Sequence, residues 1–205
     1  DTYFDPLPFW YPPLETAATD TDTYPLAAIT QRPMAMYHSW DSQNAWLRQI
    51  HSHNYLHVNP LTAAGAGIAD GGWCWAESPW GRVRCMVRTS EAVEPGTVWT
   101  WNAIGKADGA WQLAPGADEA RKGFLLNHLI TDELPQPGGR TISNSDPVTG
   151  QAGWYDVRVR LRPAEPEEAA ITWPQMATVP AAPGVLGKRP PGAADVAYFA
   201  GEARR

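Results

Sequence analysis

Residues 24–50 read YPLAAITQRPMAMYHSWDSQNAWLRQI, and this stretch decides the fold. Its apolar segment at 26–30, LAAIT, predicts a buried strand, which the Gln31-Arg32-Pro33 sequence terminates. The strand therefore delivers an amide and a guanidinium at its carboxyl end. A guanidinium in that position is suited to bind an anionic ligand.

Polar groups continue beyond the predicted strand. Tyr37, His38 and Ser39 offer hydrogen-bond donors, and residues 45–50 predict a short amphipathic helix whose apolar side chains share one face. Ser42 is the predicted N-cap of that helix, so free backbone N–H groups would lie beside the histidine and the serine. This junction of strand and helix is compatible with a bound phosphate.

Composition favours one β-rich domain and excludes several classes of protein. The 205 residues include 20 Pro and 18 Gly but only 19% charged residues, which argues against a helical bundle and for a turn-rich fold. A formal net charge of −6 gives no basic surface for nucleic acid. No apolar run approaches the length of a membrane span, so we expect no direct membrane insertion.

Short strands separated by turns dominate the rest of the pattern. A helical turn is predicted at 60–67, where Pro60 suits the first helical position and Gly67 the stop, and a helix at 118–126. This order suits a small barrel better than a doubly wound sheet, which needs helices between most strands. The further predicted strands are 55–59, 73–77, 82–88, 97–102 and 155–161.

Alternation along these strands predicts which side chains are buried. The eleven Trp residues, together with aromatic residues near the N-terminus, also predict an apolar surface patch if the chain is isolated from a longer parent polypeptide. The side chains expected in the core are Leu26, Ile29, Val58, Trp75, Val83, Val87, Val98 and Val157.

Cysteine and histidine give no metal site. Cys74 and Cys85 lie on the two strands that flank the turn at 78–81. A hairpin there would allow a disulfide, but packing as small hydrophobic residues is the better interpretation, and neither Cys has zinc or iron–sulfur spacing. We interpret the cluster of His51, His53 and His57 as structural, because the sequence shows no converging geometry for a metal ion.

Several motifs follow the order typical of one known family. They are a strand ending in Thr-Gln-Arg, a His-Ser pair, an N-x-W-L helix, HVNPLTAAGAGIADGGWCWAESPWGRVRCMV at 57–87 and NSDPVTGQAGWYDVRVRL at 144–161. Over residues 24–161 the chain thus resembles the C-terminal molybdopterin-dinucleotide-binding domain of the dimethyl-sulfoxide-reductase family of molybdenum or tungsten oxidoreductases. The resemblance implies a mainly β fold, a double-psi β-barrel with a few short helices. Gln31 departs from the family pattern, which often has Gly there.

The resemblance also implies a cofactor site built from strand ends and loops, with no catalytic residue and no metal ligand of its own. Three of the implied site residues also have a purely structural interpretation. Arg32 could form a solvated ion pair, Asn44 could cap a helix, and Asn102 could form the turn that closes its strand. The implied cofactor-binding residues are Gln31, Arg32, His38, Ser39, Asn44, Asn102, Asn144, Asp146, Trp154 and Tyr155.

Three segments are predicted along the chain. Residues 1–23 form an extended connector, residues 24–161 the barrel domain, and residues 162–205 a Pro/Ala-rich tail that is extended or disordered, with a short helix at 195–203. The chain starts at Asp1 without an initiator Met. This start is compatible with a processed product, but together with the resemblance it favours a fragment of a longer polypeptide.

By resemblance, the chain clamps the bis-molybdopterin-guanine-dinucleotide cofactor of a longer molybdenum or tungsten oxidoreductase and is inactive alone. The protein ligand to the metal and an iron–sulfur cluster would belong to preceding domains of the same subunit. An iron–sulfur electron-transfer subunit would be its partner, in a cytoplasmic location, with any membrane association made through partner subunits.

The motifs also resemble one branch of the family more than the others. The sequence around Asn127-His128 and 144–161 is most similar to the branch that acts on sulfur compounds such as sulfite. A formate dehydrogenase-type domain is the enzymatic alternative. A non-catalytic double-psi barrel that serves as a binding module is the alternative of a different class, because fold alone does not define function.

Overall fold

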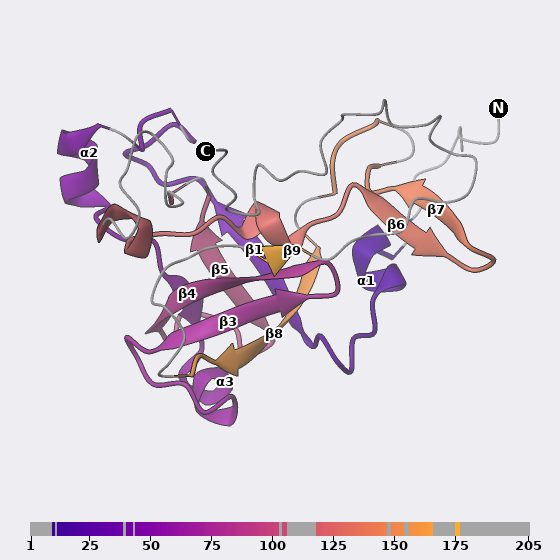
Figure 1. Cartoon of the computed structure of the whole chain (residues 1–205), viewed down its shortest axis with the longest axis horizontal. Helices are drawn as coiled ribbons and strands as arrows, with labels where there is room; N and C mark the ends of the chain where they lie inside the picture. The colour runs from indigo at the N-terminus through magenta and orange to yellow at the C-terminus, as the bar shows by residue number, and fades with distance from the viewer. Residues whose placement is uncertain are drawn as a thin grey trace, which may run out of the picture.

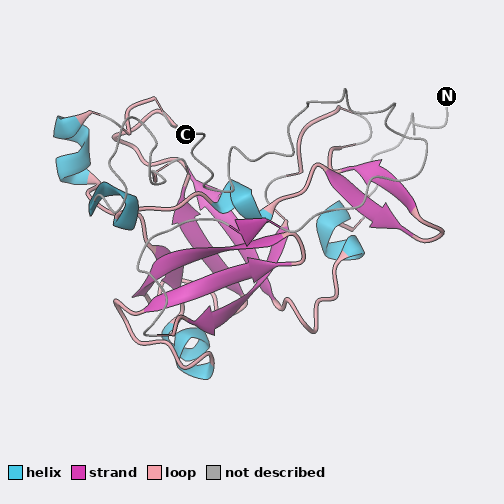
Figure 2. Cartoon of the chain, viewed as in Figure 1, coloured by secondary structure: helices cyan, strands magenta, loops and turns pink. Residues whose placement is uncertain are grey.

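The computed structural model describes residues 10, 12–38, 40–42, 44–102, 104–105, 118–146, 149–153, 156–165 and 175–176. Strands form the central body and short helices lie around it (Figures 1 and 2). Within the described ranges, no helix has the length and apolar character needed to span a bilayer.

The strands of the central sheet close into a barrel. Its order is β2 (Leu56–Val58), β5 (Thr97–Trp101), β1 (Leu26–Gln31), β8 (Val157–Pro163), β3 (Trp73–Ser78) and β4 (Gly81–Thr89), and β2 also pairs with β4. A short strand, β9 (Gln175–Met176), adds to β4, and β6 (Glu133–Gln136) pairs with β7 (Arg140–Ser143) in a separate hairpin. The helices are α1 (Leu14–Ala18), α2 (Ala45–Ile50), α3 (Pro60–Gly65) and the 3₁₀ turns η2 (Asp118–Arg121) and η3 (Leu126–Leu129).

Closure depends on the short strand β2. Its Val58 pairs antiparallel with Val98 of β5, and its Leu56 pairs parallel with Val87 of β4. The β1–β5 pair is also parallel, whereas the remaining barrel pairs are antiparallel. The prediction of a mainly β barrel is therefore confirmed.

Strand direction defines the two ends of the barrel. Strands β1 and β5 are parallel, so their carboxyl ends lie at the same end of the barrel. Strand β8 is antiparallel to β1 and β2 is antiparallel to β5, so the amino ends of β8 and β2 also lie at this end. We call this the β1 end. Helix α2 precedes β2 and lies at the β1 end, whereas α3 follows β2 and lies at the opposite end (Figure 1).

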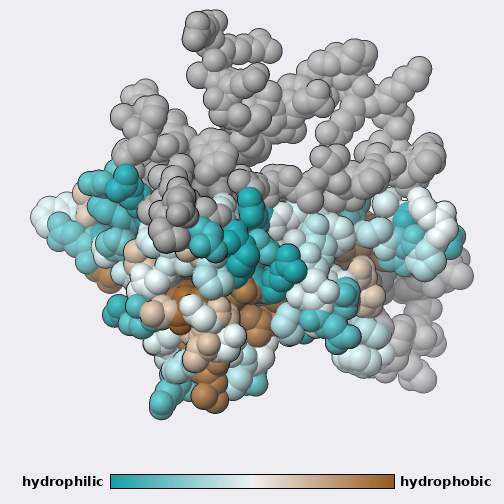
Figure 3. All heavy atoms as spheres, turned by 60° about the horizontal axis from the view of Figure 1, so that its bottom comes forward, coloured by the Kyte–Doolittle hydropathy of each residue, from teal (hydrophilic) through white to brown (hydrophobic). Residues whose placement is uncertain are grey.

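The core fills the barrel with the residues that alternation selects. All the predicted core side chains are buried except Ile29, which is half-buried; in β1 it is Leu26, Ala28 and Thr30 that face inward. Phe124 and Leu129, from the segment after β5, are also fully enclosed. Figure 3 turns the bottom of Figure 1, where α3 lies, toward the viewer and shows apolar side chains interspersed with polar ones on that surface.

Cys74 and Cys85 face each other across the β3–β4 pair. They are register partners, their Sγ atoms are 3.6 Å apart, and both are buried free thiols. Burial raises the pKa of the Cys85 thiol well above its ordinary value, which keeps it protonated. The interpretation of the two cysteines as small hydrophobic core residues is confirmed.

Several predicted elements differ from the structure. The helix predicted at 118–126 is replaced by the separate turns η2 and η3, and the segment predicted as an extended connector contains α1. The sequence pattern gives no sign of the β6–β7 hairpin, whose turn Gly138 and Gly139 allow by adopting φ of 81° and 74°. The last strand of the barrel runs over 157–163 rather than 155–161, and the segment predicted at 195–203 lies outside the described residues.

Backbone contact at Gly123 provides a test of the fold. A Cβ there would lie 2.5 Å from Ile104 O, so we expect Gly123→Ala to force two chain segments apart and lower the free energy of unfolding by about 1–3 kcal/mol. Chemical denaturation measures the change. As the matched control, Gly65→Ala at the end of α3 meets nothing within 4 Å and should be neutral or stabilising by about 0.4–1 kcal/mol. Equal effects of the two substitutions would contradict this backbone arrangement.

Candidate cofactor site at the β1 end

Two neighbouring strands bring their polar ends together. Asn102 follows β5, and its backbone N–H donates to Gln31 O at 2.7 Å, which extends the β1–β5 pairing by one residue. Asn102 is buried, whereas Gln31 and the following Arg32 are exposed. The parallel pairing therefore places an amide side chain inside the barrel end and a guanidinium at its surface.

The loop after β1 folds back over these strand ends. His38 Nδ1 lies 3.3 Å from Asn102 Nδ2, and the His38 backbone has a φ of 50°, in the left-handed region. The Tyr37 ring packs against the His38 ring edge to face, with centroids 5.2 Å apart, and the Arg32 guanidinium lies 5.8 Å from the Tyr37 ring centroid. Arg32, His38 and Asn102 thus form one cluster, which we call the Asn102 cluster.

Two buried oxygens near this cluster lack hydrogen-bond partners. Asn102 Oδ1 and Thr30 Oγ1 are both enclosed and have no such partner among the described residues. A buried acceptor without a donor costs roughly 1–3 kcal/mol, so native proteins rarely retain one without a reason. A ligand that carries N–H donors would satisfy such acceptors.

Asn54 supports the end of β5. Its Nδ2 donates to Trp101 O at 2.9 Å and to Phe124 O at 3.2 Å, and its Oδ1 accepts from Thr100 Oγ1 at 2.9 Å. The amide therefore fixes the strand that carries Asn102 against the segment at 122–124. Sequence reasoning missed this residue, because a single Asn among histidines gives no signal of such distant partners.

A second buried cluster lies at the same end of the barrel. Glu15 of α1 is fully buried and accepts from Trp80 Nε1 and from Asn144 Nδ2, each at 3.1 Å, while its backbone N–H donates to Asp156 Oδ2 at 3.0 Å. Trp80 belongs to the turn between β3 and β4, and Asp156 directly precedes β8. We call these residues the Glu15 cluster.

Burial controls the ionisation of Glu15. Desolvation raises the pKa of this carboxyl to about 7; the donors Trp80 and Asn144 act in the opposite direction, and the nearby Asp156 charge adds to the rise. Asn144 uses its amide N–H groups on Glu15 and on Thr131 O, and its Oδ1 has no hydrogen-bond partner among the described residues. The position of Asn144 is thus set by internal bonds.

Two other predicted site residues have structural partners. Asn44 caps α2 in place of Ser42, because its Oδ1 accepts from two backbone N–H groups in the first turn of that helix. This is the structural alternative to cofactor binding by Asn44. Asp146 Oδ1 accepts from Thr149 N at 2.7 Å and closes its own loop.

The structure brings part of the predicted site together. Ser39, Trp154 and Tyr155 lie outside the described residues. The predicted residues that the structure brings together are Gln31, Arg32, His38 and Asn102, whereas Asn144 belongs to the separate Glu15 cluster. Their binding to cofactor stays a prediction.

The histidines make ring contacts on the outside of β2 and β5. His57 stacks on Trp99 with centroids 3.9 Å apart and planes 6° apart, and His51 meets Trp101 edge to face. Burial, followed by the charge of Arg88, lowers the pKa of His57 and favours a neutral ring. Among the described residues, no cluster of three or more His, Cys, Asp or Glu side chains could hold a metal ion.

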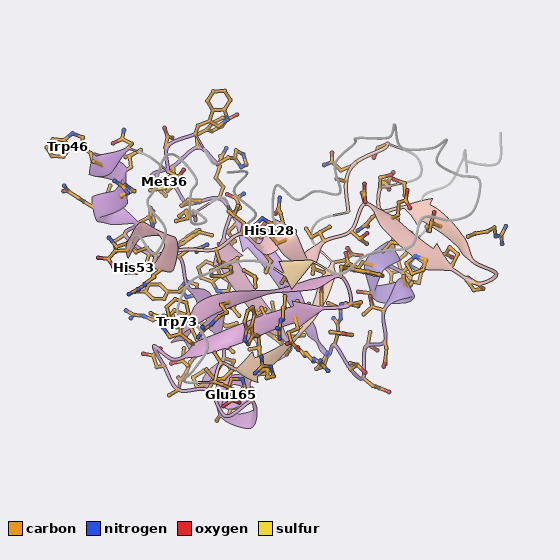
Figure 4. The ribbon with its side chains drawn as sticks, in the orientation of Figure 1. Met36, Trp46, His53, Trp73, His128 and Glu165 are labelled. Carbon is orange, nitrogen blue, oxygen red and sulfur yellow. The ribbon has the colours of Figure 1, made fainter. Side chains whose placement is uncertain are left out.

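A small pocket lies between α2 and the segments at 104–105 and 122–123. It has a volume of about 20 Å³, enough for a water molecule but not for a dinucleotide. Met36, one of the residues that line this pocket, lies beside α2 in Figure 4. His128 lies outside the pocket, near the upper end of the barrel (Figure 4), and burial lowers the pKa of its ring. The pocket is lined by Met36, Ser42, Arg48, His51, Ser52, Ile104, Gly105, Lys122 and Gly123.

The chain belongs to the family described as "Molydopterin dinucleotide binding domain", which it matches over residues 26–145. A sulfite dehydrogenase subunit from Allochromatium vinosum is 68% identical to it over 190 residues, which are 92% of this chain and 20% of that protein. Dopamine dehydroxylase from Eggerthella lenta is 28% identical over 157 residues, 74% of this chain and 14% of the relative. The chain therefore spans a small part of the curated relatives it matches.

A solved structure supports the fold. Acetylene hydratase from Pelobacter acetylenicus aligns with a TM-score of 0.58 at 22% identity, and the match covers 78% of this chain and 22% of that one. At this level of identity the likeness concerns fold alone. With the closed barrel described above, it confirms the predicted double-psi β-barrel.

The raised pKa of Glu15 predicts how stability depends on pH. Because the folded pKa of about 7 exceeds the ordinary 4.5, the folded state binds the proton more tightly than the unfolded state. The free energy of unfolding should therefore fall as pH rises from about 4.5 to about 7 and then level off, by about 3 kcal/mol at most. Glu15→Gln should remove this contribution, which melting temperatures measured across that range would show.

A second variant tests whether the pKa of Glu15 causes this pH dependence of stability. Trp80→Phe removes a donor that lowers the Glu15 pKa, so the fall in stability should extend to higher pH than in the wild type. Parallel pH profiles for the wild-type protein and Glu15→Gln would show that Glu15 is not responsible.

Proposed function

We propose that this chain is the cofactor-binding part of a bis-molybdopterin-guanine-dinucleotide oxidoreductase that acts on a sulfur compound such as sulfite. The observation that carries the proposal is a pair of buried acceptors, Asn102 Oδ1 and Thr30 Oγ1, which have no partner in the described part of the chain and lie beside the exposed Arg32 in a member of this domain family. The 68% identity to a sulfite dehydrogenase subunit supports a sulfur substrate over formate.

The residues of the β1 end fit such a cofactor chemically. A pterin and a guanine carry N–H donors, which match the two buried acceptors, and a diphosphate matches the planar fork of Arg32. His38 lies within reach of Asn102 and offers a further polar contact to the ligand. When bound, the metal and its dithiolenes supply two-electron redox chemistry.

The role of this chain is to hold and orient. Asn54 and the β1–β5 pairing fix Asn102, and the folded-back loop fixes His38, so the polar groups are positioned before the ligand arrives. A preorganised site loses less conformational entropy on binding. Cys74 and Cys85 are buried in the core, so we place the iron–sulfur cluster and the protein ligand to the metal elsewhere in the full-length subunit.

The partners follow from the same proposal. The relative from Allochromatium vinosum is named as one subunit of its enzyme, which supports an assembly with other subunits. An iron–sulfur electron-transfer subunit would accept the two electrons. We propose a cytoplasmic location, with any association with a membrane made through such partner subunits.

Replacing Arg32 tests the proposed site. In the full-length enzyme, Arg32→Ala should lower cofactor retention, because a charge-assisted hydrogen bond contributes roughly 1.5–3 kcal/mol. Arg32→Lys should restore retention only in part, since Lys lacks the planar fork. Molybdenum content and released guanine nucleotide, measured beside the melting temperature, report retention separately from folding.

The matched control is Arg140→Ala. Arg140 is an exposed residue of the β6–β7 hairpin, outside the Asn102 cluster, so its loss should leave cofactor content unchanged. Full occupancy in a folded Arg32→Ala enzyme would remove Arg32 from the site.

A further inference from the structure

The polar contacts between helix α1 and the described parts of the barrel all pass through one residue. Glu15 is the one member of this five-residue helix whose side chain is buried, and it is fully enclosed. The helix packs against β6 and β8 and lies outside the barrel sheet (Figure 1). Its N-cap, Pro13, supplies no side-chain hydrogen bond. A helix this short is unstable alone in water, so its docking depends on what Glu15 contacts.

Three hydrogen bonds reach Glu15 from three separate segments. Trp80 Nε1 of the β3–β4 turn and Asn144 Nδ2 each donate to one carboxyl oxygen at 3.1 Å. The Glu15 N–H donates to Asp156 Oδ2 at 3.0 Å, which satisfies a donor in the first turn of the helix that has no partner within the helix. A change in the state of this one residue therefore acts on all three attachments of α1.

Two acidic groups lie together in this enclosed cluster. Asp156 is half-buried, and its Oδ1 is enclosed without a hydrogen-bond partner in the described part of the chain. A second negative charge on Glu15 must share this water-poor space, which disfavours the ionised form of Glu15. The loop that carries Asn144 adds Asp146, whose Oδ1 accepts hydrogen bonds within that loop.

The other charged groups on the elements around α1 do not neutralise Glu15. On β8, the Arg158 guanidinium donates to a backbone carbonyl of the segment before β1, and only the Arg158 backbone N–H acts on Glu15. On β6 the charged residue is Glu133, a further acid. Beside the β3–β4 turn, Glu77 and Arg82 pair with each other at 3.8 Å. Among the described residues, therefore, no cation forms an ion pair with Glu15.

We propose that Glu15 acts as a pH-sensitive latch: loss of its proton lets α1 leave the end of the barrel while the barrel strands stay paired. Closure does not need α1, because the barrel strands pair with one another. A segment with few contacts opens locally at a lower cost than the whole fold. Release would give solvent access to the indole of Trp80 and the amide of Asn144. The inference does not depend on the proposed function.

The direction of the pH effect follows from the two states of Glu15. Burial, opposed by the donors Trp80 and Asn144, raises the pKa of Glu15 to about 7 in the docked helix, against its ordinary 4.5 in a released one. The docked form binds the proton more tightly, so release becomes easier as the pH rises from about 4.5 to about 7 and then levels off. Between pH 5 and pH 8 the equilibrium constant for release should rise roughly seventyfold.

Hydrogen exchange of the full-length subunit, followed by mass spectrometry of its peptides, tests the latch. Protection factors, which correct for the intrinsic effect of pH on exchange, should fall about seventyfold within residues 13–18 between pH 5 and pH 8. The internal control is α3, a helix of six residues at the opposite end of the barrel, which has no acidic or basic side chain. The protection of α3, and that of β3 and β4, should stay constant.

Matched variants assign the effect to Glu15. Glu15→Gln is neutral at every pH, so the protection of α1 should no longer depend on pH. Asp156→Asn removes the neighbouring charge but keeps an acceptor for the Glu15 N–H, so the loss of protection should shift to lower pH. The control is Glu133→Gln on β6, an acid that is not among the groups that shift the pKa of Glu15, and it should leave the profile unchanged.

The possible results separate a latch from other effects of pH. Constant protection of α1 across this range in the wild-type protein would overturn the inference, and so would a loss of protection that persists in Glu15→Gln. Simultaneous loss of protection in β3 and β4 would show unfolding of the domain in place of release of the helix and would also overturn it. An equal change in α3 would contradict it by showing a general response to pH.

Discussion

Closure of the barrel through β2 is the constraint on which the rest of the structure depends. Three residues, Leu56–Val58, hydrogen-bond to β5 on one side and β4 on the other. Without them the sheet would have two open edges, one along β5 and one along β4. Closure also explains why Asn54 matters, since it ties the chain just before β2 to the end of β5.

The β1 end contains two polar clusters, and each has a buried oxygen without a hydrogen-bond partner among the described residues: Asn144 Oδ1 in the Glu15 cluster and Asn102 Oδ1 in the Asn102 cluster. In the Glu15 cluster the carboxylate has donors on both oxygens, and its function is to join α1, the β3–β4 turn and the start of β8. In the Asn102 cluster an enclosed oxygen lacks a donor from the described residues, and an arginine is exposed. The fully bonded Glu15 carboxylate holds elements of the fold together, whereas the exposed Arg32 makes the Asn102 cluster the better candidate for an anionic ligand.

The sequence is sufficient to predict features that depend on local pattern. It predicts the strand at 26–31 and the polar residues at its end, because an apolar run and its termination are local signals. It predicts a buried side chain at Ile29, which is half-buried, because an apolar run does not show whether its odd-numbered or its even-numbered residues face the core. The cap of α2 depends on where the helix starts, which propensity defines poorly, so Ser42 is predicted in place of Asn44. The role of Glu15 could not be predicted, because its partners are as far as 141 residues away.

The pairing of β1 with β8 has a consequence for the order of events during synthesis. Ala28 pairs with Val157, so the first strand of the barrel waits for a partner that is translated much later. Contacts this distant form slowly, because a long loop must close before they contribute. Until then this edge of β1 is unpaired, and such edges promote aggregation. The β1 end is therefore complete only after β8 has been translated, because both the β1–β8 pairing and the Glu15–Asp156 bond need that late segment.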